Sequence, residues 1–295
     1  AYIGSDSLIF GNINSTYLFA NIGNSSGCAQ TSEESNPIIK NIELLYVNNV
    51  TSMFGTFKNL GYTNMKTFSV GTNFDTSNVT DMGGMFKGIG YTAMTSLDLG
   101  SKFNTSKVTN MSSMFSDTGY TAMTSLNLGS SFYTSSVTDM SYAFIRTGRT
   151  AMTTLTLGSN FNTSIVKDMQ GMFAECGYTA MTSLNLGSSF YTSQVETMRA
   201  MFKNTGYTAM QTLNLGSNFN TSNVTNMNEM FYQTGHTAMT GLSLGSGFNT
   251  AKVTDMGSMF EGTGYAKMTT LDLGDNFNVS QVTNMKAMFK TTGYT

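Results

Sequence analysis

The stretch MTSLDLGSKFNTSKVTNMSSMFSDTGY, residues 94–120, recurs along the chain every 29 residues and decides the fold. Its last two residues mark the period. Gly-Tyr begins at residues 61, 90, 119, 177, 206, 264 and 293, while Gly148-Arg149 and Gly235-His236 occupy the two remaining steps. A fixed period of this length indicates a solenoid, in which each unit stacks on its neighbours.

The first part of the unit has the pattern of a short strand. Leu97 and Leu99 alternate with Ser96 and Asp98, so the leucines are expected to point inward. With Met94 they form a Met-x-x-Leu-x-Leu kernel, which matches the strand of a leucine-rich repeat with Met in the first position.

The second part of the unit has a helical pattern. Apolar residues of segment 108–115 fall at i, i+3, i+6 and i+7, one face of a helix of roughly two to three turns. Thr105-Ser106 precedes it as a pair of N-cap residues, and Gly119 follows as a C-cap glycine. The predicted fold is an α/β solenoid of the leucine-rich-repeat type, with one short parallel strand and one short helix per 29-residue unit and about nine units.

The repeat covers most of the chain. Units follow one another in strict register from about residue 65, and a shorter unit precedes them from Ile39. We therefore predict a solenoid over 38–295 whose C-terminal end is open and continues in a longer protein. Residues 1–37 do not match the repeat and are predicted to be an N-terminal cap, with a possible hairpin, or the end of a preceding domain.

The composition of the chain limits the classes of partner that we expect it to bind. The net charge is −2, from 15 basic and 17 acidic residues, so we expect no nucleic acid to bind. No apolar run approaches the roughly 18 residues that span a bilayer, so we expect no membrane insertion of this stretch. Only 11% of the residues are charged, and Ser, Thr, Asn and Gly supply the polarity, which is typical of secreted and surface proteins.

Sulfur-containing residues fit a structural role. All 24 methionines lie in repeat register, which predicts core packing rather than metal capture. Cys28 and Cys176 have no CxxC partner, so we expect no metal site. Cys176 replaces a threonine that most other units carry, and we interpret it as a small residue that the slot tolerates.

Catalytic chemistry finds no support in the sequence. His236 is the single histidine, so no Ser-His-Asp set can form, and we predict no enzyme activity, no cofactor and no metal. One row of Asp and Asn residues raises the alternative of calcium binding, but its members alternate and Thr197 interrupts them. We predict that they are polar residues at helix starts. The row is Asp81, Asn110, Asp139, Asp168, Asn226, Asp255 and Asn284.

Two surfaces remain as candidates for binding. The exposed strand face carries rows of hydroxyl and amide residues that raise ice or glycan binding as alternatives, although a solvated structural face is favoured. The aromatic row is the candidate interaction surface, because Arg and His replace Tyr there and thus indicate exposure. Its members are Tyr62, Tyr91, Tyr120, Arg149, Tyr178, Tyr207, His236 and Tyr265.

The kernel Val-Thr-x-Met-x-x-Met-Phe of residues 108–115, followed by Leu126-Asn127-Leu128, resembles the BspA-type leucine-rich repeats of bacterial surface proteins. These repeats belong to the group of mycoplasma lipoproteins and related surface proteins of unknown function. The resemblance covers roughly residues 38–295, and the 29-residue unit is longer than is usual.

The resemblance implies an extracellular protein of the bacterial cell surface, anchored to the wall or by lipid in its full-length form. The expected function is non-catalytic recognition or adhesion, with a host or neighbouring-cell protein or glycan as partner. The alternative is a structural element, such as a stalk, wall layer or filament, that self-associates through the solenoid ends.

Overall fold

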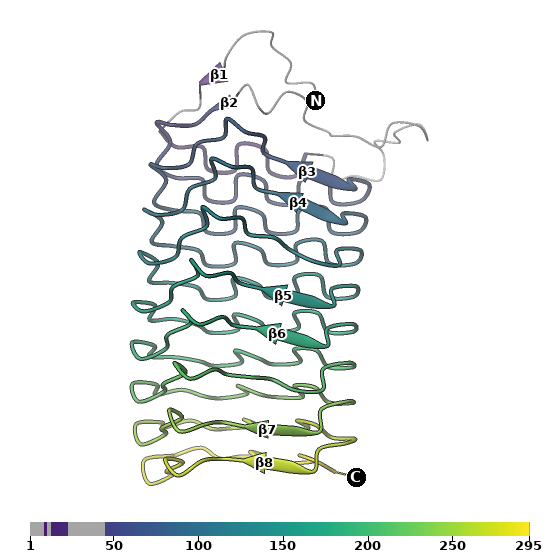
Figure 1. Ribbon diagram of the computed structural model, residues 1–295, viewed down its shortest axis with the longest axis vertical. Helices are drawn as coiled ribbons and strands as arrows, with labels where there is room; N and C mark the ends of the chain where they lie inside the picture. The colour runs from purple at the N-terminus through teal and green to yellow at the C-terminus, as the bar shows by residue number, and fades with distance from the viewer. Residues whose placement is uncertain (1–8, 11–12, 23–44, 295) are drawn as a thin grey trace.

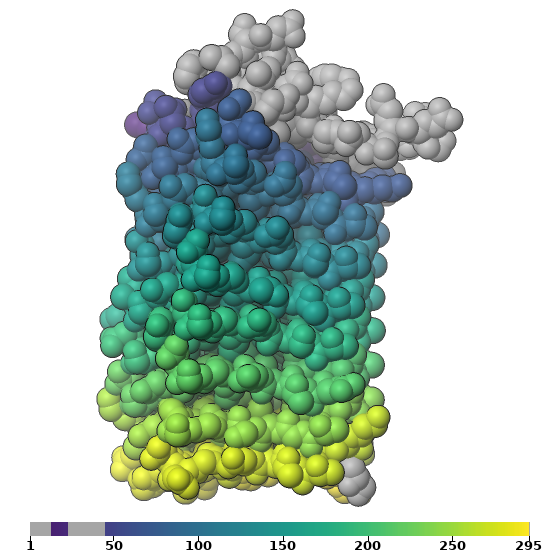
Figure 2. All heavy atoms as spheres, viewed as in Figure 1, coloured from purple at the N-terminus to yellow at the C-terminus, as the bar shows by residue number. Residues whose placement is uncertain are grey.

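Each 29-residue repeat forms one coil, and successive coils stack along one axis (Figure 1). The computed structural model describes residues 9–10, 13–22 and 45–294. In the space-filling view, successive coils cross the visible face as layers of successive colour (Figure 2).

Short parallel strands pair between coils. The pairs are β1 (Ile9–Phe10) with β2 (Leu45–Tyr46), β3 (Thr67–Ser69) with β4 (Ser96–Asp98), β5 (Thr154–Thr156) with β6 (Ser183–Asn185), and β7 (Gly241–Ser243) with β8 (Thr270–Asp272). The strands β3 to β8 all lie at one position of the repeat. The predicted strand pattern is confirmed in these elements, since Leu97 and Leu155 are buried between exposed neighbours.

A second parallel ladder runs the length of the stack. It consists of single bridges between the same position of successive coils, such as Asp81 to Asn110 and Asn110 to Asp139. The ladder begins with a bridge from Asn14 to Ser52, so residues 13–22 lie against the coil that contains Ser52. The predicted domain boundary after residue 37, like Cys28, lies outside the described residues.

The predicted helix is wrong. No helix occurs in residues 9–10, 13–22 or 45–294, so the chain is not an α/β solenoid with one helix per unit. Between Val108 and Gly119 the chain instead forms consecutive turns. The amides of Met111, Ser113 and Phe115 donate to carbonyls 28 residues ahead, at 3.0, 2.8 and 2.8 Å. The amides of Met114 and Ser116 donate three residues back, at 3.2 and 3.0 Å.

The backbone conformation shows why the helical pattern misleads. Ser113, Asp117 and Gly119 have φ values of 55°, 59° and 50°, whereas an α-helix requires negative φ throughout. Glycine occupies the Ser113 position in three other coils, at residues 55, 84 and 171, which is the sequence signal for left-handed backbone. A helix this short is also marginal in water, while bonds to the next coil satisfy the backbone at every second residue.

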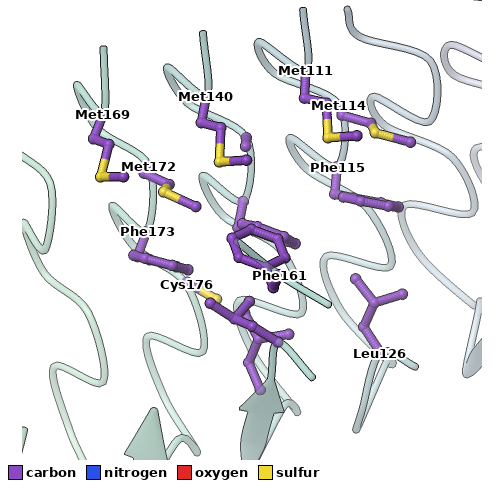
Figure 3. Close-up of a cluster of buried hydrophobic side chains, with 14 of the residues drawn as sticks. Met111, Met114, Phe115, Leu126, Met140, Phe161, Met169, Met172, Phe173 and Cys176 are labelled. Carbon is purple, nitrogen blue, oxygen red and sulfur yellow. The ribbon is translucent and has the colours of Figure 1, made fainter. Parts of the chain in front are cut away.

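The interior is built from rows of identical side chains. One row of phenylalanines, from Phe57 to Phe289, has ring centroids 5.4–5.7 Å apart in successive coils. A second row, from Phe132 to Phe248, has spacings of 6.3–6.5 Å. Met111, Met140 and Met169 repeat one orientation in three coils (Figure 3). The predicted core role of the methionines is confirmed for 23 of the 24, which are buried, while Met285 in the last described coil is exposed.

Buried threonine hydroxyls join the coils, and the predicted N-cap role of Thr105 is wrong because no helix follows it. Thr105 donates its hydroxyl to the Tyr133 carbonyl of the next coil at 2.6 Å. Val279, which lacks this hydroxyl, lies in the last described coil.

Cys176 fills a second threonine slot. In that slot Thr147 donates to the Phe115 carbonyl at 2.7 Å and Thr118 to the Phe86 carbonyl at 2.9 Å. Cys176 is a free thiol and fully buried in the same position (Figure 3). Burial raises the pKa of the Cys176 thiol to about 12, so it behaves as an inert small residue. The interpretation that the slot tolerates it is confirmed.

Replacing Ser113 by Gly tests the turn backbone. We expect S113G to raise the free energy of unfolding by about 1 kcal/mol, because left-handed backbone penalises any Cβ. In a helix the same change would lower it by about 0.5 kcal/mol. Urea unfolding midpoints measure the difference. The neighbouring S112G is the control and should destabilise, since Ser112 lacks positive φ. A lower midpoint for S113G than for the wild type would contradict the turn assignment.

Candidate functional site

The aromatic row places one half-buried side chain of each coil against the next. Five ring pairs between Tyr62 and Tyr265 have centroids 4.3–4.7 Å apart and planes within 13° of parallel. Tyr294 continues the row at 5.5 Å from Tyr265. The structure therefore brings together all eight residues predicted as the candidate interaction surface.

Arg149 bridges the gap that it leaves in the row. Its guanidinium carbon lies 4.0 Å from the Tyr178 ring centroid and 5.5 Å from that of Tyr120. Its Nε donates to Glu175 Oε2 at 2.8 Å. The cation thus replaces an aromatic ring between two π faces while a carboxylate neutralises its charge.

The stacking limits what the row can bind. Neighbouring rings cover each other's faces, so a ligand can reach only the remaining exposed part of each half-buried side chain. Burial and the neighbouring Tyr120 raise the pKa of Tyr91, so its hydroxyl remains protonated at neutral pH. Burial lowers the pKa of His236, which therefore stays neutral at pH 7. The row is suited to hydrogen bonding along its length rather than to ring-face stacking on a ligand.

The strand face has a structural role over part of its surface. Asp98, Asn127 and Asn185 each accept the amide of the glycine two residues later, at 2.9 Å. Ser69 donates to Asp98 of the next coil at 2.9 Å. These bonds hold the turn after the strand and favour the structural interpretation of the outer strand row over a free hydroxyl strip.

The Asp and Asn row does not mark helix starts, because there are no helices among the described residues. Each side chain instead accepts the amide two residues later, as Asp81 does from Gly83 at 3.0 Å. Asn110 also donates its Nδ2 to Asp81 Oδ1 at 2.9 Å, which joins two coils. Within the described part of the chain, no three His, Cys, Asp or Glu residues are placed to hold a metal ion.

Asp139 and Asp168 are neighbouring members of this row, and both carry a carboxyl group. They bridge in parallel, and each accepts an amide two residues later at 2.8 Å. Burial raises the pKa of Asp168, and the charge of Asp139 adds to the increase, while the hydrogen bond from Gln170 opposes it. The position therefore opposes ionisation of Asp168.

Charged side chains of the turn segments pair between coils. Arg146 Nε lies 2.7 Å from Asp117 Oδ1, and Lys290 Nζ lies 2.8 Å from Glu261 Oε1. Lys203 Nζ lies 2.9 Å from Glu229 Oε2. Such pairs contribute little when exposed. The variable, charged positions are thus largely engaged with neighbouring coils.

Two exposed tyrosines were not predicted as site residues from the sequence. Tyr133 and Tyr191 occupy the position after the inward Phe of their coils, where Phe103, Phe161 and Phe219 are followed by Asn. The alternation of Asn and Tyr at one repeat position was the available signal.

The stacked coils define the protein as a repeat protein. The chain belongs to the family described as "Mycoplasma protein of unknown function, DUF285", whose profile matches residues 26–147, 119–238 and 206–294. No match was found among curated proteins or among solved structures. Among the described residues no helix is long and apolar enough to span a membrane.

Replacing Asp168 by Asn tests whether repulsion between the carboxylates of Asp139 and Asp168 destabilises the fold. We expect D168N to raise the free energy of unfolding at pH 7 by about 1 kcal/mol, because the new amide can donate to Asp139 as Asn110 does to Asp81. A carboxyl with a raised folded-state pKa stabilises the protein most below the unfolded pKa of about 3.9, and this contribution is lost as pH rises through the folded pKa. The gain should therefore be smaller at pH 4 than at pH 7, as urea unfolding at both values would show.

The reciprocal variant N110D is the matched control. It places a second carboxylate beside Asp81 and removes the amide donor, so it should destabilise at pH 7 and less at pH 4. An unfolding midpoint of D168N that equals the wild type at both pH values would contradict the proposed repulsion.

Proposed function

We propose that the chain is a non-catalytic recognition module of a bacterial cell surface, with a macromolecular partner bound along the side of the coil stack. The carrying observation is the aromatic row, which repeats one half-buried side chain over the eight coils from Tyr62 to Tyr265. Because each ring is held between its neighbours, little side-chain entropy remains to be lost on binding.

Three observations support recognition over catalysis. The repeat carries a single histidine, and that residue lies inside the ring stack. The space between core side chains such as Met111, Phe132 and Phe161 has no room for water and offers no polar group. The resemblance to BspA-type surface proteins and membership of a Mycoplasma family favour a surface location. The partner proposed here is a host or neighbouring-cell protein or glycan.

Removing row hydroxyls tests this function. The variant combines Tyr91→Phe, Tyr120→Phe, Tyr178→Phe and Tyr207→Phe, which keeps the ring stack. Wild-type protein should bind at least one member of a panel of extracellular-matrix proteins, host cells and glycans other than β-1,4-linked glucans and chitin in surface plasmon resonance or cell-binding assays. We expect the variant to bind that partner about tenfold or more weakly, because several hydrogen bonds are lost.

The control is Tyr142→Phe, a tyrosine outside the row whose hydroxyl contacts the Gln170 amide. It should bind as the wild type does. Absence of wild-type binding to every member of the panel, or equal binding by the row variant, would contradict the proposal.

A second candidate function is structural self-association. Met285 and Phe289 of the last described coil are 49% and 45% exposed, whereas Met256 and Phe260 of the preceding coil are fully buried. This coil presents an apolar edge on which a coil of a second copy can pack.

Light scattering across a concentration range tests self-association. The 295-residue chain should form concentration-dependent oligomers, and Met285→Ser with Phe289→Ser should remove them. A wild-type protein that stays strictly monomeric at the highest concentration would contradict self-association.

A further inference from the structure

Exposed apolar side chains gather at three places in the described chain. Ten large hydrophobic residues of the described chain are exposed, and seven of them lie in the first or last described coil, which has only one described neighbour. The other three are Tyr133, Ile165 and Tyr191, at 38%, 42% and 38% exposure. They lie on three consecutive coils in the middle of the stack, where both neighbours are present. An end effect therefore does not explain this mid-stack patch.

The two tyrosines belong to an alternating row. The position after the inward Phe holds Asn104, Tyr133, Asn162, Tyr191 and Asn220 in five consecutive coils. Aromatic and amide side chains thus alternate along the stack. Since adjacent coils are separated by about 4.8 Å, the two rings repeat at about 10 Å along the stack axis.

Tyr133 and Tyr191 lack a side-chain hydrogen bond that Asn and Asp make at this position in the other coils. Asn104, Asn162 and Asn220 each accept the backbone amide two residues later at 2.9 Å, and three more coils repeat the bond. Tyrosine has no side-chain acceptor at that place, and the amides of Ser135 and Ser193 lack a partner within the described residues. Both tyrosines break a local rule of the fold with no compensating contact, which is the pattern expected of a functional position.

The backbone of the two tyrosines is fixed, and their side chains are partly exposed. Thr105 and Thr163 hold the carbonyls of Tyr133 and Tyr191 at 2.6 Å from the adjacent coil. No aromatic ring or cation in the described chain lies against either ring. This contrasts with the aromatic row, where neighbouring rings cover each other. Tyr133 and Tyr191 therefore expose part of each side chain that no other ring of the described chain covers, and a ligand can contact it there.

The surroundings of the patch are neutral. Segments 130–136, 159–165, 188–194 and 217–223 contain no charged residue and consist mostly of Ser, Asn and Thr around the inward Phe. Asn162 lies between the two tyrosines, and its Oδ1 is used within its own coil. Its Nδ2 makes no bond within the described chain and can donate to a ligand. Flat apolar platforms alternating with neutral donors suit an uncharged ligand rich in hydroxyl groups.

We propose that Tyr133, Asn162 and Tyr191 form a binding site for a neutral, extended polysaccharide that lies along the stack axis. The two rings would stack on alternate sugar rings, since an extended β-1,4-linked chain presents the same sugar face once per disaccharide. Asn162 donates to the sugar between them, and Ile165 packs against its apolar face. This site is separate from the aromatic row, and the proposal does not require that row to bind a partner.

Variants that place the neighbouring residue type in each position test the site. Y133N and Y191N restore the amide bond of the other coils, so the melting temperature should stay equal or rise. Wild-type protein should bind cellohexaose and chitohexaose in isothermal titration calorimetry and should bind α-1,4-linked maltohexaose at least tenfold more weakly. Each single variant should weaken the binding of the β-1,4-linked hexaoses tenfold or more, and the double variant should abolish it.

A gain-of-function variant gives an independent check. Asn249 lies two coils beyond Tyr191 at the same position, so N249Y should add a third platform and tighten binding of hydroxyethylcellulose in affinity electrophoresis. The quadruple Tyr→Phe variant of the aromatic row should bind cellohexaose as the wild type does. Failure of wild-type protein to bind either β-1,4-linked hexaose, or equal binding by the double variant, would overturn the site. Neither result would affect matrix-protein binding by the aromatic row, so the two proposals fail separately.

Discussion

Backbone hydrogen bonds between residues 28 to 30 positions apart hold this protein together, and every other regularity depends on them. They occur along the paired strands, along the single-bridge ladder and through the turn segments. Since these bonds fix the offset between coils, any side chain that recurs in the sequence must recur in space as a row. The phenylalanine rows, the buried hydroxyls and the aromatic row are consequences of that one constraint.

Much of the fold was predictable because buried positions recur in the sequence as apolar residues at a fixed spacing. The period, the inward leucines, the methionine core and the tolerance of Cys176 in its slot follow from residue type and spacing. The helix did not follow, because a run of turns that points every third or fourth side chain inward leaves the same apolar pattern in residues 108–115. The distinguishing signal was glycine at positions 55, 84 and 171, which requires attention to φ rather than to hydrophobicity.

The residues of the candidate site were predictable from the sequence, but their stacked arrangement was not. The Gly-Tyr marker identified all eight residues of the aromatic row, yet only the structure shows that the rings cover one another. Tyr133 and Tyr191 were not predicted because a repeat position that holds two residue types resembles neutral sequence variation between the units. Their meaning depends on a hydrogen bond made by Asn in the other coils, which no single unit reveals.

The fixed offset between coils also constrains how such a chain can change in evolution. Insertion or loss of residues must be absorbed within one step between coils, as in the step from Asn14 to Ser52, which spans 38 residues and still keeps the ladder. Duplication or deletion of a whole 29-residue unit leaves all contacts in register, since each coil contacts only its neighbours. Length is therefore free to vary in whole units, and the reach of the binding face would change with it in steps of about 4.8 Å.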